Sequence, residues 1–387
     1  MIDIILTSHL QSEVCKINLT HNLDGLILPI KEETKFWLTQ AIPDESTSPI
    51  KVTAHETMLH VIAGVTSRIF VGLPRSREKK WLATAVNYTL DVFRVSTALR
   101  TYPPFLRSFV APWLDSTNRL RVHVKTAKDC FGSIFAQRLA LPDGEREAND
   151  MFQWMVDSAS GADRNPEVLV RKMLFLTLAA IHTSTMSVTH ALLDLCTYPE
   201  YVEPLRGEIH EIVGTHGWTL ASINKLKLLD SFLKESQRVN HPGLLSFNRR
   251  VMKSLQLSDG TEIPSGSFIC MATNSIAHDP ENYPNPNQFD GFRFYKKRLS
   301  SQMDANLHQF ASTGPNSLAF GHGKFACPGR FFAAAQIKVI IATILFQYDI
   351  SFPDGQSARP ENIFSGESIG PDRSQSVVFK RRSRIEC

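Results

Sequence analysis

The sequence lacks most of the features that assign a protein to a specialised class. Its six cysteines are scattered over 387 residues and include no Cys-x-x-Cys pair, which argues against a zinc site or a disulfide framework and suits a reducing compartment. The formal charge of +4 is too small to indicate a nucleic-acid partner, and the basic run at residues 380–382 is typical of a solvated tail. We therefore expect no nucleic acid among its partners.

Long apolar runs are also missing. The longest, residues 173–181 and 339–346, have the length of core helices rather than the roughly 18 residues of a membrane span. Residues 1–6 are too short for a signal peptide and lack its basic flank. The composition, 43% hydrophobic and 21% charged, is that of a folded globular protein. We expect no membrane anchor in this chain.

The periodicity of apolar residues predicts a mainly α-helical chain with small β-sheets. Helices are expected at residues 19–40, 52–70, 77–100, 113–138, 144–162, 165–196, 199–214, 228–239 and 330–346. Strands are expected at residues 247–252, 255–257 and 267–271, on either side of an Asp-Gly turn at 259–260, and a C-terminal hairpin at 364–378.

The predicted central helix begins with a favourable cap, Asn165 followed by Pro166. Its roughly 30 residues would extend about 45 Å, which is enough to cross a whole domain. The middle is apolar on every side apart from Thr177 and should be buried. It then leads into small residues, a histidine and hydroxyls at 179–185. These could leave room for a ligand and supply protons, or the hydroxyls could simply bond back to helical carbonyls.

One stretch near the C-terminus, residues 320–330, places a cysteine between a glycine-rich turn and an apolar helix. Cys327 would lie at a helix N-terminus, where unpaired N–H groups and the helix dipole favour a thiolate. Gly321, Gly323 and Gly329 allow a turn that a side chain would block, and allow a flat partner to approach. The alternative is an ordinary buried cysteine before a core helix.

Two further patterns lie between these segments. Glu235 and Arg238 are three residues apart on one helix face, close enough to pair. Downstream, residues 286–294 read Pro-Asn-Gln-Phe-Asp-Gly-Phe-Arg-Phe and contain Arg293. A carboxylate held by two arginines would be locked in its ionised form and rigid. Alone, an i,i+3 ion pair carries almost no information, because such pairs are common on helix surfaces.

The cysteine stretch, Phe-x-x-Gly-x-x-x-Cys-x-Gly, resembles the haem-binding loop of the cytochrome P-450 family, the haem-thiolate monooxygenases. The central helix, the Glu-x-x-Arg pair and the Pro-x-x-Phe-x-x-x-Arg-Phe segment occur in the order found in that family. The resemblance implies a cytochrome P-450 fold, with residues 1–387 forming a single domain that is N-terminally truncated. The resemblance further implies that full-length relatives carry a membrane anchor of the endoplasmic reticulum and first β and helical elements, which we expect to be absent from this chain.

The resemblance also implies roles for individual residues. Cys327 would be the axial ligand of haem iron, with Phe320, Gly321, Gly323 and Gly329 at the cofactor, and Arg249, or Arg250 close behind, would bind a haem propionate unless it lies on a solvated strand face. Thr183 would manage protons, with His182 in place of the family's acid. Glu235, Arg238 and Arg293 would form a structural triad. The substrate pocket would be lined by Ala179, Ala180, Leu244, Leu245, Ser368 and Ile369. Phe325 departs from the family, which has His or Arg there against a haem propionate.

The function implied is a haem-dependent monooxygenase that inserts oxygen into a hydrophobic small molecule, such as a fungal terpenoid or meroterpenoid secondary metabolite. Electrons would come from NADPH through a partner reductase. Two alternatives stay open: an isomerase or dehydratase of the same fold without oxygen chemistry, and an inactive truncated remnant that holds no haem. If the chain were instead an all-helical interaction protein, its four matches to the motifs of this family would need another explanation.

Overall fold

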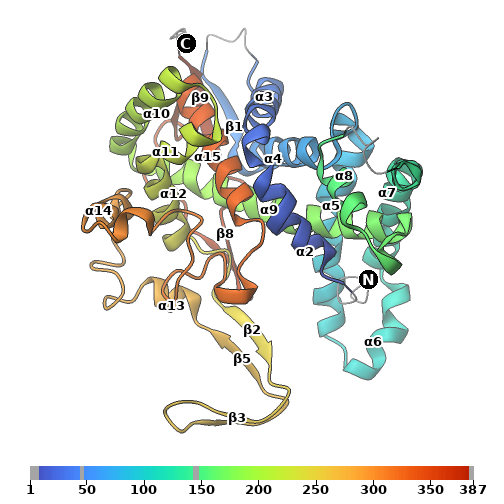
Figure 1. The fold of residues 1–387 in the computed structure, drawn as a ribbon. Helices are drawn as coiled ribbons and strands as arrows, with labels where there is room; N and C mark the ends of the chain where they lie inside the picture. The colour runs from blue at the N-terminus through green and yellow to red at the C-terminus, as the bar shows by residue number, and fades with distance from the viewer. Residues whose placement is uncertain (1–7, 44–47, 143–147, 383–387) are drawn as a thin grey trace.

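The computed structural model describes residues 8–43, 48–142 and 148–382. Figure 1 shows a mainly helical body from which one long hairpin projects. Its α-helices are α2 (Leu10–Val14), α3 (Leu23–Ala41), α4 (Ala54–Val71), α5 (Lys79–Arg100), α6 (Pro104–Val110), α7 (Asp115–Ala140), α8 (Met151–Ser158), α9 (Pro166–Thr197), α10 (Val202–His216), α11 (Leu220–Lys225), α12 (Lys227–Val239), α13 (Thr273–Ala277), α14 (Arg293–Leu299) and α15 (Arg330–Gln347). Its strands are β1 (Ile50–Thr53), β2 (Ser246–Arg250), β3 (Leu255–Gln256), β4 (Glu262–Ile263), β5 (Phe268–Met271), β6 (Tyr348–Ser351), β7 (Ile363–Ser365), β8 (Ser368–Gly370) and β9 (Ser376–Arg381). Part of the helix predicted at 144–162 lies outside the described residues.

Helix α9 runs through the middle of the body (Figure 1). Its cap is the predicted one: the Asn165 side chain accepts a hydrogen bond of 2.8 Å from the Glu167 N–H, and Pro166 is the first helical residue. Met173, Leu174, Leu176, Thr177 and Ile181 are buried as expected, because other helices surround them, but burial on every side is wrong: Ala179 is exposed and Phe175, Leu178 and Ala180 are half-buried. The helix therefore carries its central residues into the interior.

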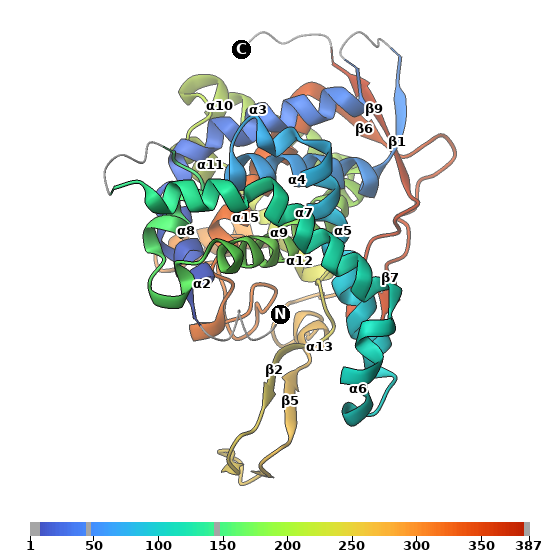
Figure 2. The same cartoon turned by 90° about the vertical axis from the view of Figure 1, so that its right-hand side faces the viewer.

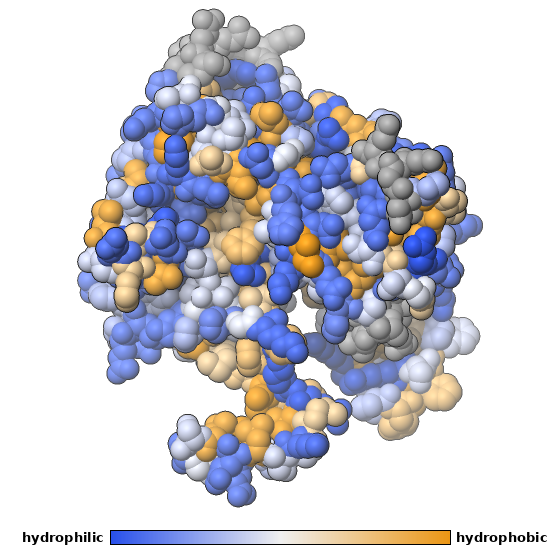
Figure 3. Space-filling view, in the orientation of Figure 1, coloured by the Kyte–Doolittle hydropathy of each residue, from blue (hydrophilic) through white to orange (hydrophobic). Residues whose placement is uncertain are grey.

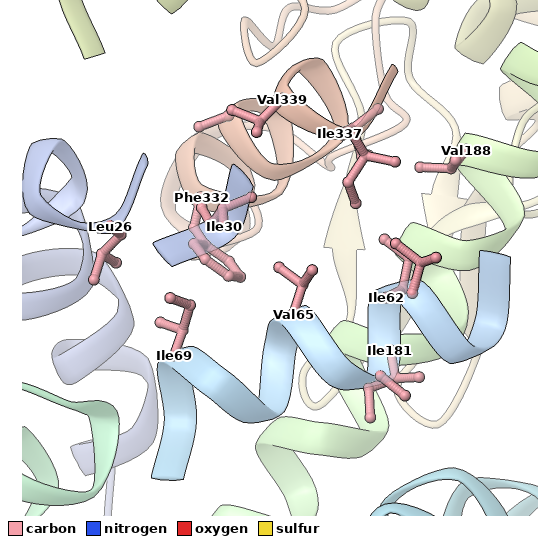
Figure 4. Close-up of a cluster of buried hydrophobic side chains, with 14 of the residues drawn as sticks. Leu26, Ile30, Ile62, Val65, Ile69, Ile181, Val188, Phe332, Ile337 and Val339 are labelled. Carbon is pink, nitrogen blue, oxygen red and sulfur yellow. The ribbon is translucent and has the colours of Figure 1, made fainter. Parts of the chain in front are cut away.

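The core joins α3, α4, α9 and α15. Figure 4 shows Leu26 and Ile30 of α3, Ile62, Val65 and Ile69 of α4, Ile181 and Val188 of α9, and Phe332, Ile337 and Val339 of α15 turned toward one another. Helix α15 is mostly apolar, and 13 of its 18 residues are buried. Since α15 starts three residues after Cys327 and packs on α9, the core fixes the cysteine loop relative to the central helix.

A three-stranded sheet, in the order β1-β9-β6, joins the segment before α4 to the end of the described chain (Figure 2). It is antiparallel, with Ile50 and Ile350 both opposite Phe379. Strands β1 and β6 were not predicted. The hairpin predicted at 364–378 is shorter than expected, because β7 pairs with β8 across a turn whereas β9 belongs to this other sheet.

The projecting hairpin contains the pairs β2–β5 and β3–β4. The three predicted strands and the turn are confirmed to within two residues, with a β-bulge between Ser246 and Arg249, but β4, which pairs with β3 across the turn, was not predicted. Figure 3 shows apolar side chains along this hairpin. The large exposed ones are Phe247, Met252, Leu255, Leu257, Phe268 and Met271.

Two helices, α9 and α15, are long and apolar enough by length and composition to cross a membrane. This differs from the prediction, which rests on uninterrupted apolar runs alone. The mean hydropathy over 18 residues stays high even where a few polar residues interrupt the run. In α9, 56% of the most apolar window is buried inside the protein, and in α15, 72%. Both helices pack in the core described above.

Candidate active site

The cysteine loop is a compact turn that leads directly into α15. The Cys327 N–H donates to the Phe320 carbonyl over 2.7 Å, which closes the turn on itself. The Phe320 ring packs against Phe310 with 5.8 Å between ring centroids. At the other end, the Arg330 guanidinium donates to the Cys327 carbonyl over 3.0 Å. Backbone and side-chain bonds thus hold both sides of the sulfur-bearing residue.

The three glycines of this loop serve different needs. Gly321 has a φ of +67°, and a Cβ there would lie 3.2 Å from the Phe325 carbonyl oxygen, so both backbone and space require glycine. Gly323 also has a positive φ, whereas Gly329 has a φ of −91° and precedes α15. A Cβ at Gly323 or Gly329 would meet no atom of the described chain within 4 Å. The loop therefore presents an open surface beside the cysteine.

The Cys327 thiol does not show the lowered pKa that its place before a helix predicts. Burial raises its pKa, and this outweighs the lowering by the Gly329 N–H, which donates to the sulfur, and by the Arg330 charge. A second thiol, Cys15 in the π-helical turn Cys15–Leu19, lies near it. Burial and the charge of Cys327 raise the pKa of Cys15 to about 12, so Cys15 stays a thiol. The protein alone does not ionise Cys327.

The middle of α9 is open on one side only. Ala179 and Thr183 are exposed although Ile181, Ser184 and Thr185 beside them are buried. Residues four apart share one helix face, so this face looks onto open space. The Thr183 hydroxyl donates to the Ala179 carbonyl over 2.7 Å. This is the back-bonding that the sequence left as an alternative, and it leaves the oxygen lone pairs of Thr183 free to accept a hydrogen bond.

His182 points to a different neighbour. Its Nε2 lies 3.0 Å from the Val86 carbonyl of α5, which implies that this nitrogen carries a proton. Burial lowers the pKa of His182, with a smaller opposing effect of the Val86 contact. The imidazole is thus held neutral against α5, while Thr183 occupies the open face.

The predicted triad is present as a buried cluster. Glu235 is 0% exposed and accepts two bonds of 2.8 Å from the Arg238 guanidinium. The Arg293 Nε lies 3.1 Å from both carboxylate oxygens, and the Asp290 N–H donates to one of them. Arg238 also donates to the Ala277 carbonyl, and Arg293 to three carbonyls of residues 284–288. The cluster ties α12 to the segment before α14.

The predicted pocket residues come from three parts of the chain, and contacts join residues 243–244 to residues 367–368 and Gly370 to Met186 of α9. The Leu244 N–H donates to the Glu367 carbonyl over 2.7 Å, and Gly243 forms a bridge with Ser368. A Cβ on Gly370 would lie 3.8 Å from the Met186 methyl group, which places β8 beside α9. Leu244 and Leu245 are half-buried and Ser368 is exposed, but Ile369 is only 1% exposed. Ile369 therefore faces the interior and not the open space that Ser368 borders.

Arg249 lies on β2 next to the cysteine loop. Its guanidinium carbon is 4.3 Å from the centroids of two rings, Phe247 on its own strand and Phe325 of the loop. Arg250, the alternative candidate, lies over Phe268 at 6.0 Å on the projecting hairpin. Only Arg249 therefore contacts the cysteine loop.

Sequence reasoning missed one polar network. Asp194 of α9 is 1% exposed and accepts from Arg359 (2.6 Å), Ser236 (2.6 Å) and Asn240 (3.1 Å). Arg359 also contacts His190 over 3.0 Å. Asp and His four residues apart on a buried helix were the available signal, but Arg359 lies in an irregular segment that no pattern marks. The network joins α9, the end of α12 and the segment that leads to β7.

Comparisons with known proteins agree with this architecture. The family model described as Cytochrome P450 matches residues 15–376. A cytochrome P450 monooxygenase of Emericella nidulans is 41% identical over 98% of this chain and 72% of its own length. An ent-kaurene oxidase of Gibberella fujikuroi is 39% identical (99% and 76%), and the monooxygenase paxP of Penicillium paxilli 38% identical (98% and 74%). In fold, the chain is similar to a cyanobacterial P450, CYP120A1 with retinoic acid bound, with a TM-score of 0.73 at 18% identity, over 96% of this chain and 78% of that one.

Proposed function

The chain belongs to the cytochrome P450 family of haem monooxygenases, and we propose that it holds haem through Cys327 and oxidises a hydrophobic terpenoid-type molecule of fungal secondary metabolism. The observation that carries this proposal is the cysteine loop: a thiol at the start of a buried helix, accepting a backbone N–H, beside glycines that leave open space. We take residues 8–382 as parts of one domain, since the core and the β1-β9-β6 sheet join its two ends.

The residues present fit a haem group. A flat macrocycle needs an unobstructed surface around its axial ligand, and Gly323 and Gly329 supply one. The raised pKa of Cys327 fits as well, because a coordinating metal deprotonates a thiol that burial alone keeps neutral. Small, exposed Ala179 and the acceptor oxygen of Thr183 would leave room for a reactant and for a water on the open face of α9. Phe320 supports the loop through its contact with Phe310.

When bound, haem supplies the activation of dioxygen, and a thiolate ligand favours cleavage of the O–O bond. The chain's own residues orient the reactants and handle protons. We propose that the Thr183 oxygen accepts a hydrogen bond from a water on the open face of α9, while its hydroxyl donates a hydrogen bond to the Ala179 carbonyl. His182, neutral and fixed on the Val86 carbonyl, keeps this turn of α9 in place and has a second ring nitrogen, Nδ1, that can relay a proton.

We propose that the substrate lies against Ala179, Ala180, Leu244 and Leu245, with Ser368 at the rim. The wall is apolar apart from hydroxyls, which suits a hydrocarbon skeleton with few polar groups. The ent-kaurene oxidase among the relatives has a diterpene in its name, and this supports a terpenoid substrate. Ile369 stands behind this wall as packing. Electrons would come from NADPH through a partner reductase, at the endoplasmic reticulum membrane.

The first experiment is a carbon monoxide difference spectrum of the reduced whole chain with haem supplied. We expect the red-shifted Soret band of thiolate-ligated haem, lost in Cys327→Ala and kept in Cys196→Ala, a half-buried cysteine of α9 away from the loop. A chain that takes up no haem would overturn the proposal. Substrate turnover under argon without NADPH would instead indicate an isomerase or dehydratase.

A further inference from the structure

Arg249 connects two segments that are 76 residues apart, β2 and the cysteine loop, through aromatic rings. Its guanidinium carbon lies 4.3 Å from the Phe247 centroid and 4.3 Å from the Phe325 centroid. Neither ring is a packing residue of the core, because Phe247 is 41% and Phe325 65% exposed. Packing in the core therefore does not account for this contact. Its effect falls on the position of the Arg249 side chain.

The backbone at Phe247 is held in an uncommon conformation. Its φ is +60°, in the left-handed region that few non-glycine residues adopt, and β2 bulges at this point. Such a conformation costs free energy and persists where the surroundings fix it; it is frequent at functional sites. Here the bulge accompanies a ring placed against the guanidinium of Arg249.

We propose that Phe247 and Phe325 form an aromatic clamp that positions the Arg249 guanidinium for a haem propionate. Phe325 would thereby supply, through Arg249, the anchoring that a cationic side chain at position 325 would supply directly. This inference rests on the proposed haem site. It makes Phe325 a positioning residue of the cofactor.

The physical basis is the quadrupole of the aromatic ring, whose negative face attracts a cation. A planar guanidinium stacked on rings keeps its in-plane N–H groups available, and these match a carboxylate in a bidentate way. One of these groups, Nη1, donates to the Asn248 carbonyl over 2.8 Å. The other donors have no partner among the residues that the structure describes. Lys324 also lies near the Phe325 ring, but at 5.8 Å, so Arg249 makes the closer contact.

The first test measures the rate of haem dissociation from the whole chain to an excess of an apoprotein acceptor. We expect roughly two- to fivefold faster loss in Phe325→Leu, which keeps apolar bulk without a ring, and the wild-type rate in Phe325→Tyr. Arg249→Gln should lose haem at least about tenfold faster. Phe268→Leu is the matched control, because it removes the arginine–phenylalanine contact made by Arg250 on the projecting hairpin.

The double variant decides whether Phe325 acts through Arg249. Phe325→Leu combined with Arg249→Gln should lose haem at the rate of Arg249→Gln alone. Fully multiplied effects would overturn the clamp, since they would show that Phe325 acts on haem or on the loop independently. An unchanged rate in Phe325→Leu, with a normal thiolate Soret band, would overturn it as well and leave the proposed function intact.

A second measurement needs no haem. A dicarbonyl reagent that modifies arginine, followed by mass spectrometry, should label Arg249 more slowly than Arg250 in the haem-free chain. The label on Arg249 should rise in Phe325→Leu and not in Phe268→Leu. Equal labelling in all three proteins would refute the clamp even if the chain took up no haem, whereas failure of haem uptake alone would refute the proposed function and the haem-directed role.

Discussion

The buried triad gives the sharpest prediction about stability. Changing Glu235 to Ala removes the one carboxylate that balances two guanidiniums, both almost completely buried. It deletes bonds from Arg238 and Arg293 and the bond from the Asp290 N–H. Removing one partner of a buried ion pair costs about 3–5 kcal/mol, because the remaining charge is left without compensation. A domain is stable by about 5–15 kcal/mol, so a large part of the stability would be lost.

The assay is urea unfolding of the haem-free chain, followed by tryptophan fluorescence. We expect a large fall in the unfolding midpoint for Glu235→Ala and a smaller one for Glu235→Gln, which keeps the shape and one acceptor. The control is Glu167→Ala, which removes exposed ion pairs with Arg171 of α9 and Lys128 of α7 and should change the midpoint far less than Glu235→Ala does. Combining Glu235→Leu with Arg238→Met and Arg293→Met should recover part of the loss, because all three charges are removed while four backbone carbonyls lose their arginine donors. A midpoint of Glu235→Ala equal to that of the native chain would refute this reasoning.

Three further predictions follow from buried or strained positions. His190 and His241 are buried; Nε2 of His190 and both ring nitrogens of His241 have no partner among the described residues, and burial lowers the pKa of each imidazole to about 3. Because the folded pKa of each histidine lies below the unfolded value of about 6.5, unfolding takes up protons below pH 6.5. Each histidine should therefore remove about 1.4 kcal/mol of folding stability per pH unit as pH falls from 6.5 toward 3. Urea unfolding midpoints at pH 7.0, 6.0 and 5.0 measure this loss, and equal midpoints would contradict it. Gly321→Ala should destabilise by about 1 kcal/mol and speed haem loss, since φ is +67° there, whereas Gly132→Ala inside α7, with open space around it, should stabilise by about 1 kcal/mol. Gly64→Ala should cost about 3 kcal/mol or more in the same assay, because its Cβ would overlap the Trp37 ring; wild-type stability would show that α3 and α4 can separate.

The features read correctly from the sequence are those that depend on neighbours along the chain. The cap at Asn165, the length of α9 and the turn at 259–260 follow from local hydrogen bonding and backbone preference. The triad was found because its order along the chain is that of a known family, since Glu235 and Arg238 alone would have been read as a surface pair. Its complete burial is decided by α14 and the loop before it, which no local pattern reveals.

The features that were missed depend on contacts between distant segments. Strand β1 is four residues long and pairs with residues near the end of the chain, so its own sequence gives little sign of a strand. The thiol of Cys327 was expected to be acidic from its place before α15, but the burial that raises its pKa comes from surrounding elements. Ile369 was expected at the pocket because the resemblance brings the C-terminal hairpin toward the substrate; in the structure strand alternation buries Ile369 and leaves Ser368 exposed.

The same reasoning applies to position 325. From the sequence, a phenylalanine there reads as a lost contact to the cofactor, because only the residue type at that position can be compared with the family. In the structure, Phe325 lies against Arg249, which the chain brings from β2. A change from a charged to an aromatic residue can therefore preserve the anchoring of an anion if the ring instead orients a neighbouring cation. Whether a substitution removes an interaction or lets a neighbouring residue make it depends on which side chain the fold places beside the substituted residue.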